Sequence, residues 1–149
     1  MDFQPEPERL TSFLKPSMIA ACGMNCGICI AYLREKKPCS GCNGTNVNKT
    51  LHCIQCVIKN CQLISESKNG FCYECSKFPC LRLQQLDKRY RTKYNMSMID
   101  NLNMIKSDGM QKFLENEKKR WTCTNCGGVI CVHKSFCISC KSTLSGQKT

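Results

Sequence analysis

The sequence predicts a small α+β fold dominated by metal binding, with short helices on cysteine knuckles and a zinc ribbon at the C-terminal end. Sixteen of the 149 residues are cysteine, eleven of them between Cys22 and Cys80 and five between Cys123 and Cys140. The apolar fraction is 42%, and without the cysteines about 31% remains, which is thin for a self-sufficient core. We therefore expect metal ligation to supply the missing stability, on the order of 10 kcal/mol per structural zinc site.

Twelve of the cysteines form Cys-x-x-Cys pairs. Both sulfurs of such a pair can reach one ion from a single turn, with amide N–H groups directed at the thiolates. The six pairs are Cys26 and Cys29, Cys39 and Cys42, Cys53 and Cys56, Cys72 and Cys75, Cys123 and Cys126, and Cys137 and Cys140. At four ligands per ion, the sequence predicts about three to four zinc ions, with an iron–sulfur cluster as the alternative cofactor.

A secreted disulfide scaffold is the other common reason for a high cysteine content. Residues 1–8 are acidic and contain two prolines, which is not typical of a secretory signal peptide. No stretch approaches the roughly 18 apolar residues that a membrane span requires. We therefore expect a cytoplasmic protein whose thiols stay reduced and bind metal.

The formal net charge of +11 overstates how basic the protein is. A zinc ion held by four thiolates carries a net charge of −2, whereas the formal count treats cysteine as neutral. Four such sites would lower the total by about 8, to about +3. Overall charge is therefore weak support for nucleic-acid binding, and local clusters must carry that hypothesis.

The cysteine spacing and the helical periodicity divide the chain into five segments. These are a leader over 1–17, a cysteine-rich multi-metal domain over 18–91, a helical linker over 92–120, a zinc ribbon over 121–141 and a disordered tail over 142–149. Apolar residues at helical spacing predict helices over 26–35, 53–65, 79–90 and 111–120. A further helix is expected to begin after Ser97, because Ser97-x-x-Asp100 has the form of a capping box.

The linker helices contain no cysteine and are expected to pack on the metal domain. The ribbon prediction rests on Cys123-x2-Cys126-x10-Cys137-x2-Cys140 with Trp121 before it and two glycines after Cys126. In a zinc ribbon two hairpin turns supply two thiolates each to a tetrahedral ion. Cys131 and His133 lie between the pairs and are not expected to bind that ion.

The ligands of the N-terminal part admit several partitions. Cys39, Cys42, Cys53 and Cys56 repeat the ribbon spacing, which would make them one site. The seven cysteines that remain would form one complete site and one site of three; they are Cys22, Cys26, Cys29, Cys61, Cys72, Cys75 and Cys80. The missing ligand could be His52, Cys131 or water. We favour His52, because small intracellular zinc modules usually close their sites, whereas water would make the ion a potential Lewis acid.

Nothing in the sequence compels an enzyme. Cys22-x3-Cys26-x2-Cys29 matches the cluster spacing of radical enzymes that use adenosylmethionine, but the large partial barrel of those enzymes does not fit in this chain. The Cys26–Cys29 pair also matches a thioredoxin-type motif, without the strand–helix–strand context that such a motif needs. An iron–sulfur or redox-active cysteine protein is therefore the alternative function, and a structural multi-zinc module that binds another macromolecule is the leading one.

A basic stretch is the candidate surface for that macromolecule, a protein or a nucleic acid. Its residues are Arg82, Lys88, Arg89, Tyr90, Arg91, Lys93 and Tyr94. The cations could neutralise phosphates while the tyrosines stack on unpaired bases. A solvated helix face would have the same composition. No membrane or small-molecule partner is expected.

The order of the cysteine motifs resembles a prokaryotic cysteine-rich family known only as a domain of unknown function. The similarity begins with Ile19-Ala20-x-Cys22-Gly23-x-x-Cys26-x-x-Cys29 and includes Cys72-x-x-Cys75-x-x-Phe78-Pro79-Cys80. It extends over residues 18–140, through Met96-Ser97-x-Ile99 to Trp121-x-Cys123-x-x-Cys126 and the later His133, Cys137 and Cys140. The resemblance implies a cytosolic metal-binding protein of bacterial or archaeal origin, with no reaction, substrate or partner attached.

Overall fold

The computed structural model describes residues 11–34, 36–42, 49, 58, 61–65 and 67–142. Its short 3₁₀ helices are η1 (Ser12–Leu14), η2 (Pro16–Met18), η3 (Cys26–Ile28) and η4 (Cys72–Glu74). Its α-helices are α2 (Ile30–Leu33), α4 (Gln62–Ser65), α5 (Leu81–Tyr94), α6 (Met98–Asp108) and α7 (Met110–Trp121). Strands β1 (Ile130–Cys131) and β2 (Phe136–Cys137) pair antiparallel, with Ile130 opposite Cys137. The structure thus confirms a small mixed fold of helices and one two-stranded sheet.

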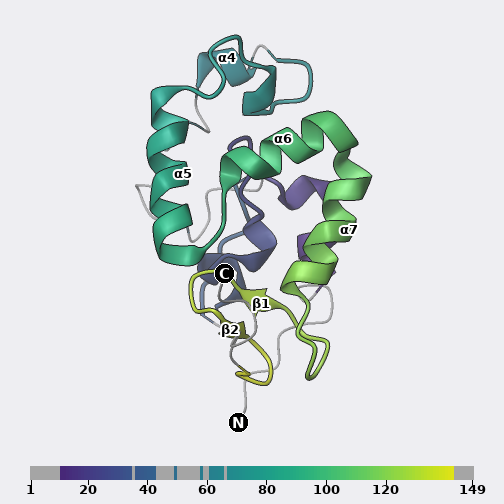
Figure 1. Ribbon diagram of the computed structural model, residues 1–149. Coiled ribbons are helices and arrows are strands. Elements are labelled where there is room, and N and C mark those ends of the chain that lie inside the picture. The colour runs from purple at the N-terminus through teal and green to yellow at the C-terminus, as the bar shows by residue number, and fades with distance from the viewer. Residues whose placement is uncertain are drawn as a thin grey trace.

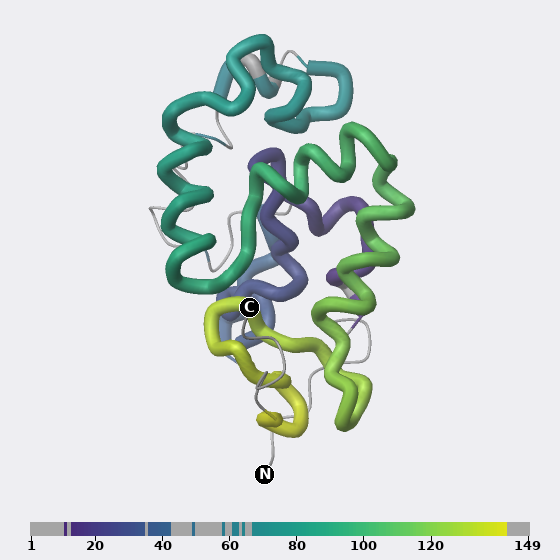
Figure 2. Tube along the Cα trace, viewed as in Figure 1, coloured from purple at the N-terminus to yellow at the C-terminus, as the bar shows by residue number. Residues whose placement is uncertain are grey.

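The three long helices form an arch around the N-terminal cysteine segment (Figure 1). α5 forms one side, α6 crosses the top and α7 descends on the other side, while the short elements of residues 11–34 lie between them. The β1–β2 hairpin sits at the open end of the arch, and the same path is visible in the tube of Figure 2. The C-terminal hairpin therefore lies next to the segment that contains Ile28, whose carbonyl accepts from the Val132 N–H.

One apolar core connects all of these parts. It takes residues from the N-terminal segment, the helices and the C-terminal hairpin, among them Phe13, Ile28, Leu33, Leu83, Met98, Leu102, Trp121, Val129 and Val132. Phe13, from the predicted leader, is only 3% exposed. The linker helices pack on the cysteine-rich segment as predicted, and the hairpin shares the core instead of folding apart from it.

The predicted helix ends agree best with the structure where a capping residue defines the end. Ser97 Oγ accepts a hydrogen bond from the Asp100 N–H at 3.1 Å, so the predicted N-cap of α6 is confirmed. Gly109 separates α6 from α7 with a φ of +90°, which an L side chain rarely adopts. α5 runs one turn beyond the predicted end and stops at Asn95, which is left-handed with a φ of +53°.

The helix predicted over 26–35 is broken in the middle. η3 ends at Ile28, Cys29 is extended with a ψ of 137°, and α2 begins after it. The Ile28 carbonyl accepts a hydrogen bond from the Val132 N–H at 2.9 Å, so it does not serve a continuing helix. A contact over more than 100 residues therefore overrides the local helical pattern.

Gly27 is required by close packing against the N-terminal turn. A Cβ built on this residue would lie 2.4 Å from Phe13 Cα and 2.6 Å from Phe13 N. Both atoms belong to the backbone, so no side-chain rotation could relieve the clash. The glycine therefore allows η1 and η3 to touch.

Asp87 joins α5 to the start of α6. Its side chain is fully buried, and Oδ1 accepts hydrogen bonds from the Ser97 hydroxyl at 2.6 Å and the Ile99 N–H at 2.9 Å. Oδ2 forms an ion pair with the Arg91 guanidinium at 2.6 Å, one turn along α5. The carboxylate thus accepts from the N-cap hydroxyl and from one early amide of α6, and its charge is balanced by Arg91 of its own helix.

A second buried acid joins α7 to the N-terminal segment. Asn25 Nδ2 donates hydrogen bonds to the Phe13 carbonyl at 2.8 Å and to Glu117 Oε2 at 3.0 Å, while Asn25 Oδ1 accepts from the Gly27 N–H. Burial raises the pKa of Glu117 above its usual 4.5, and the Asn25 hydrogen bond and the Arg120 charge only partly oppose this rise. The charged form of Glu117 is thus a cost to folding.

We expect Glu117→Gln to raise the free energy of unfolding at neutral pH by about 1 kcal/mol, because it removes a buried charge and keeps an oxygen acceptor for Asn25. The folded pKa is raised, so the wild type is relatively most stable below pH 4.5 and loses stability as the pH rises through the folded pKa. The difference in the free energy of unfolding between wild type and Glu117→Gln should therefore vanish in acid.

Urea unfolding of both proteins from acid to neutral pH measures the difference in their free energies of unfolding. Acid effects that are common to both proteins cancel in this difference. Glu115→Gln is the matched control, since Glu115 is exposed on the same helix and should give no pH-dependent difference. A Glu117→Gln protein less stable than wild type at neutral pH would contradict the assignment.

Candidate metal centre

Cys123, Cys126, Cys137 and Cys140 form a four-thiol cluster, here called the C-terminal quartet. All four Sγ atoms lie within 4.8 Å of one another. The sulfurs of Cys126 and Cys137 lie 3.5 Å apart and those of Cys123 and Cys140 lie 3.6 Å apart. Zn–S bonds of about 2.3 Å in a tetrahedron place the sulfurs about 3.8 Å apart, so the quartet fits such an ion.

The first turn of the quartet is shaped by its glycines. Gly127 has a φ of +79° and donates its N–H to the Cys123 carbonyl at 2.9 Å. The Gly128 N–H is directed at Cys126 Sγ at 3.4 Å, and a Cβ at Gly128 would lie 3.0 Å from Cys137 Sγ. The second glycine therefore lets the two halves of the site approach each other.

The second turn follows β2 and has the same construction. The Lys141 N–H bonds the Cys137 carbonyl at 3.0 Å, and the amides of Ser139 and Cys140 act on Cys137 Sγ. Figure 1 shows the hairpin that carries both halves at the open end of the helical arch. The sequence reasoning is confirmed in that these four cysteines converge, with Cys131 and His133 outside the quartet.

The thiols of the quartet differ in acidity. Hydrogen bonds from Ser142 and Asn125 lower the pKa of Cys140 to about 5. Burial raises the pKa of Cys137 to about 12. Cys140 is therefore the more acidic of these two thiols, and a metal bound by all four sulfurs would have to displace the proton of Cys137.

The N-terminal cysteines meet across their pairs. The Cys42 N–H is directed at Cys26 Sγ at 3.3 Å, and Cys42, burial and Cys22 together hold the pKa of Cys26 well above its usual value. Cys29, by contrast, interacts with Cys39 and Cys131. The contacts of Cys39 and Cys42 in the described residues therefore point to two different groups of thiols, and these groups are looser than the quartet.

The remaining predicted ligands lie at the other end of the molecule or outside the described residues. Cys61, Cys72, Cys75 and Cys80 belong to the segment around α4, η4 and the start of α5, far from the hairpin in Figure 1. The Lys77 N–H points at Cys75 Sγ at 3.4 Å, as in a metal-binding turn. His52, Cys53 and Cys56 lie outside the described residues. Throughout the described ranges the cysteines form no disulfide bonds.

His133 connects the hairpin to α5 and to the Cys29 turn. Its Nδ1 accepts a hydrogen bond from the Ile30 N–H at 3.2 Å, and Nε2 lies 2.8 Å from the Tyr90 hydroxyl. Because an amide can only donate, the ring proton of the neutral histidine resides on Nε2 and is donated to Tyr90. Burial, assisted by the Lys134 charge, lowers the pKa of His133 and favours this neutral form. Both ring nitrogens are thus occupied by protein contacts.

The tyrosines of the basic stretch face the interior. Tyr90 and Tyr94 contact the His133 ring edge-on, with centroid distances of 5.6 and 4.9 Å. Stacking on unpaired bases would require both rings to leave these contacts. The structure therefore does not support the tyrosines as the base-stacking part of the predicted surface.

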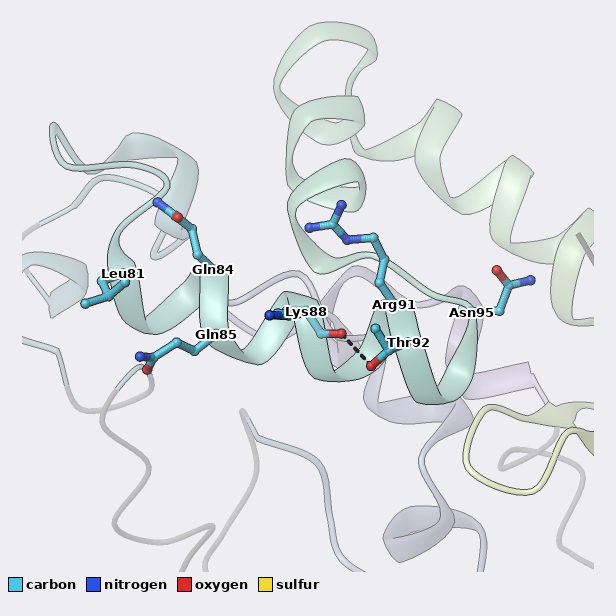
Figure 3. Close-up of a pocket in the computed structure, with 7 residues that line it drawn as sticks. All are labelled: Leu81, Gln84, Gln85, Lys88, Arg91, Thr92 and Asn95. Atoms are coloured by element: carbon cyan, nitrogen blue, oxygen red, sulfur yellow. Dashed lines mark hydrogen bonds between the residues drawn. The ribbon is translucent and has the colours of Figure 1, made fainter.

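The cations of the stretch lie on the outside of α5. Arg82, Lys88, Arg89 and Lys93 are exposed, and Arg91 is 61% exposed while it pairs with Asp87. A shallow groove of about 770 Å³ runs along this helix, and Figure 3 shows Lys88 and Arg91 among its lining residues. The other lining residues are Leu81, Gln84, Gln85, Thr92 and Asn95. The arrangement suits an electrostatic contact with an extended anion.

Comparison with protein-family models, with curated proteins and with solved structures gives no match to this chain. Among the helices that the structure describes, none combines the length and the apolar character needed to cross a membrane.

Sequence reasoning missed the role of the residues between the ribbon pairs. Cys131 is fully buried, and His133 makes the two hydrogen bonds that join the hairpin to the rest of the fold. Cys131 is one of three candidates for the missing ligand, because eleven N-terminal cysteines are one short of three sets of four, but the sequence favours His52. No sequence signal links His133 to Tyr90, which lies 43 residues away.

Proposed function

We propose that this protein is a zinc-dependent structural module that presents the cationic face of α5 to a polyanionic macromolecule. The convergence of four thiols within 4.8 Å in the C-terminal quartet carries the first part of the proposal. Four thiolates in a tetrahedron suit zinc, and they suit iron as well. Zinc is favoured because Cys123 and Cys137 belong to the shared apolar core, which gives the turns of the quartet a structural role.

Replacing Cys137 and Cys140 together by Ser is expected to remove one metal ion per chain, because two hydroxyls do not replace two thiolates on zinc. Metal analysis of the purified proteins by plasma mass spectrometry measures the loss. Ser139→Ala, in the same turn, should keep the full metal content. An unchanged metal content in the double variant would exclude the quartet as a binding site, and brown protein containing iron would favour the iron–sulfur alternative.

The second part of the proposal rests on the charge of α5. The helix carries five cations and one acid, and the acid is the buried Asp87. Without available tyrosines, contact with a nucleic acid would run through the phosphates and depend little on base identity. Nucleic acid is therefore the first partner to test, and an acidic protein surface is the other outcome.

We expect Arg89→Glu with Lys93→Glu to weaken binding of a fluorescent oligonucleotide at least tenfold at low salt, and to reduce the slope of log affinity against log salt by about two. Arg91 is left unchanged because it neutralises Asp87. Lys106→Glu with Lys119→Glu, on α6 and α7, makes the same charge change elsewhere and should alter the affinity much less. Fluorescence anisotropy is the readout, and equal losses in both double variants would show a nonspecific charge effect.

A further inference from the structure

Strand β1 places Cys131 beside the turn that carries Cys29. The Val132 N–H donates to the Ile28 carbonyl at 2.9 Å, and the Ile30 N–H donates to His133 Nδ1 at 3.2 Å. The two residues that flank Cys29 are thus hydrogen-bonded to the two residues that follow Cys131. The turn of Cys29 and the strand that carries Cys131, 102 positions apart in the chain, therefore lie next to each other.

Cys39 joins this pair from a third segment. Its N–H donates to the Ala31 carbonyl at 2.8 Å, within the helix that follows Cys29. Cys29 interacts electrostatically with both Cys131 and Cys39, so it lies between the other two in this group. Cys29, Cys39 and Cys131 are here called the bridging trio.

The amides around the bridging trio follow the pattern of the quartet. The Gly41 N–H is directed at Cys39 Sγ at 3.4 Å, two residues on, as Gly128 is directed at Cys126. The N–H groups two and three residues after Cys29, Cys131 and Cys137 are directed at the sulfur of that cysteine. The donors are Ala31 and Tyr32 for Cys29, His133 and Lys134 for Cys131, and Ser139 and Cys140 for Cys137. Amides grouped at a sulfur stabilise a thiolate, whereas a cysteine that only fills the core has no need of them.

We propose that Cys29, Cys39 and Cys131 bind one zinc ion, which ties the C-terminal hairpin to the N-terminal cysteine segment. This inference rests on the proposed function as a zinc-dependent module and adds a site that the spacing of the pairs does not predict. His133 is not a ligand, because both of its nitrogens serve the protein. The three Sγ atoms of the trio do not all lie within 4.8 Å of one another, so zinc binding requires them to move to the separation of about 3.8 Å that a tetrahedral site needs.

The number of cysteines agrees with this assignment. Sixteen cysteines divide into four sets of four, and the quartet leaves twelve only if Cys131 is counted as a ligand. Cys26, with its neighbours Cys22 and Cys42, remains separate from the trio. Cys131 thus takes the place for which His52 is favoured from the sequence, and the fourth ligand of the trio comes from outside these three residues.

The direct test is proton–cadmium correlation NMR on the full chain reconstituted with cadmium, which takes the same thiolate sites as zinc. The β-protons of Cys29, Cys39 and Cys131 should all correlate with one cadmium resonance, distinct from the resonance of the quartet. Cys131 protons that correlate with no cadmium, or with the quartet ion, would overturn the proposal. Because the measurement uses the wild-type chain, a misfolded variant cannot obscure it.

A second test counts zinc by native mass spectrometry. Cys131→Ser should hold one ion fewer than wild type and keep the quartet ion, and Cys131→Ser with Cys137→Ser and Cys140→Ser should hold two fewer. Val132→Thr is the control: it also places a hydroxyl in the core next to β1, and it should hold as many zinc ions as wild type. Wild-type protein without zinc would defeat the proposed function itself, whereas zinc-loaded wild type with an unchanged count in Cys131→Ser would defeat only the bridging trio.

Discussion

Removing metal from the reduced protein is expected to abolish its cooperative thermal transition. Ordinary apolar residues make up only about 31% of the chain, and the described core is built around cysteine-bearing turns. A structural zinc site can contribute on the order of 10 kcal/mol to folding, which equals or exceeds the whole stability of a typical domain. The loss should extend over the entire chain, because the hairpin and the helices share one core.

Differential scanning calorimetry and circular dichroism, with and without excess chelator in reducing buffer, measure the effect. Restored zinc should bring the transition back, which separates metal loss from irreversible damage. Wild-type protein that keeps its spectrum and its transition after every metal has been removed would show that packing alone holds the fold.

The largest effect expected of a single substitution far from the cysteines is that of Asp87→Ala, about 3–5 kcal/mol of destabilisation. The change leaves the Ser97 hydroxyl and the Ile99 N–H without their acceptor, at the start of α6. It also leaves the Arg91 charge without its partner. The α5–α6 corner would then lose its buried side-chain network.

Urea unfolding of the zinc-loaded protein checks this loss. Asp87→Asn should lose less, because the amide oxygen can still accept from Ser97 and Ile99. Asp108→Ala, at the exposed end of α6, should change the stability by less than about 0.5 kcal/mol. If Asp87→Ala behaves like Asp108→Ala, the buried network contributes little to the stability of the fold.

The features that sequence predicts best here depend on local chemistry. The Ser97 cap and the convergence of Cys123 with Cys140 each follow from residues close together in the chain. A cap needs one side-chain oxygen at a helix start, and a cysteine turn needs a fixed spacing. Such rules act over a few residues and can be read from the sequence.

The features that sequence does not predict are contacts between distant segments. The Val132 N–H donates a hydrogen bond to the Ile28 carbonyl, and the helix expected over 26–35 is interrupted there. No local sequence pattern predicts this hydrogen bond. Likewise, the stretch around Tyr90 has the composition of a nucleic-acid-binding surface, but the Tyr90 hydroxyl is hydrogen-bonded to His133 on the inner side of the helix. In both cases a tertiary hydrogen bond overrides a local preference, which a single sequence cannot show.

Native mass spectrometry of freshly purified, reduced protein tests directly whether zinc holds the fold together. We expect a mass above that of the bare chain by three or four zinc ions, with two protons lost for each ion, and one ion fewer when Cys137 and Cys140 are replaced by Ser. A folded chain at its metal-free mass would show that the fold does not depend on zinc.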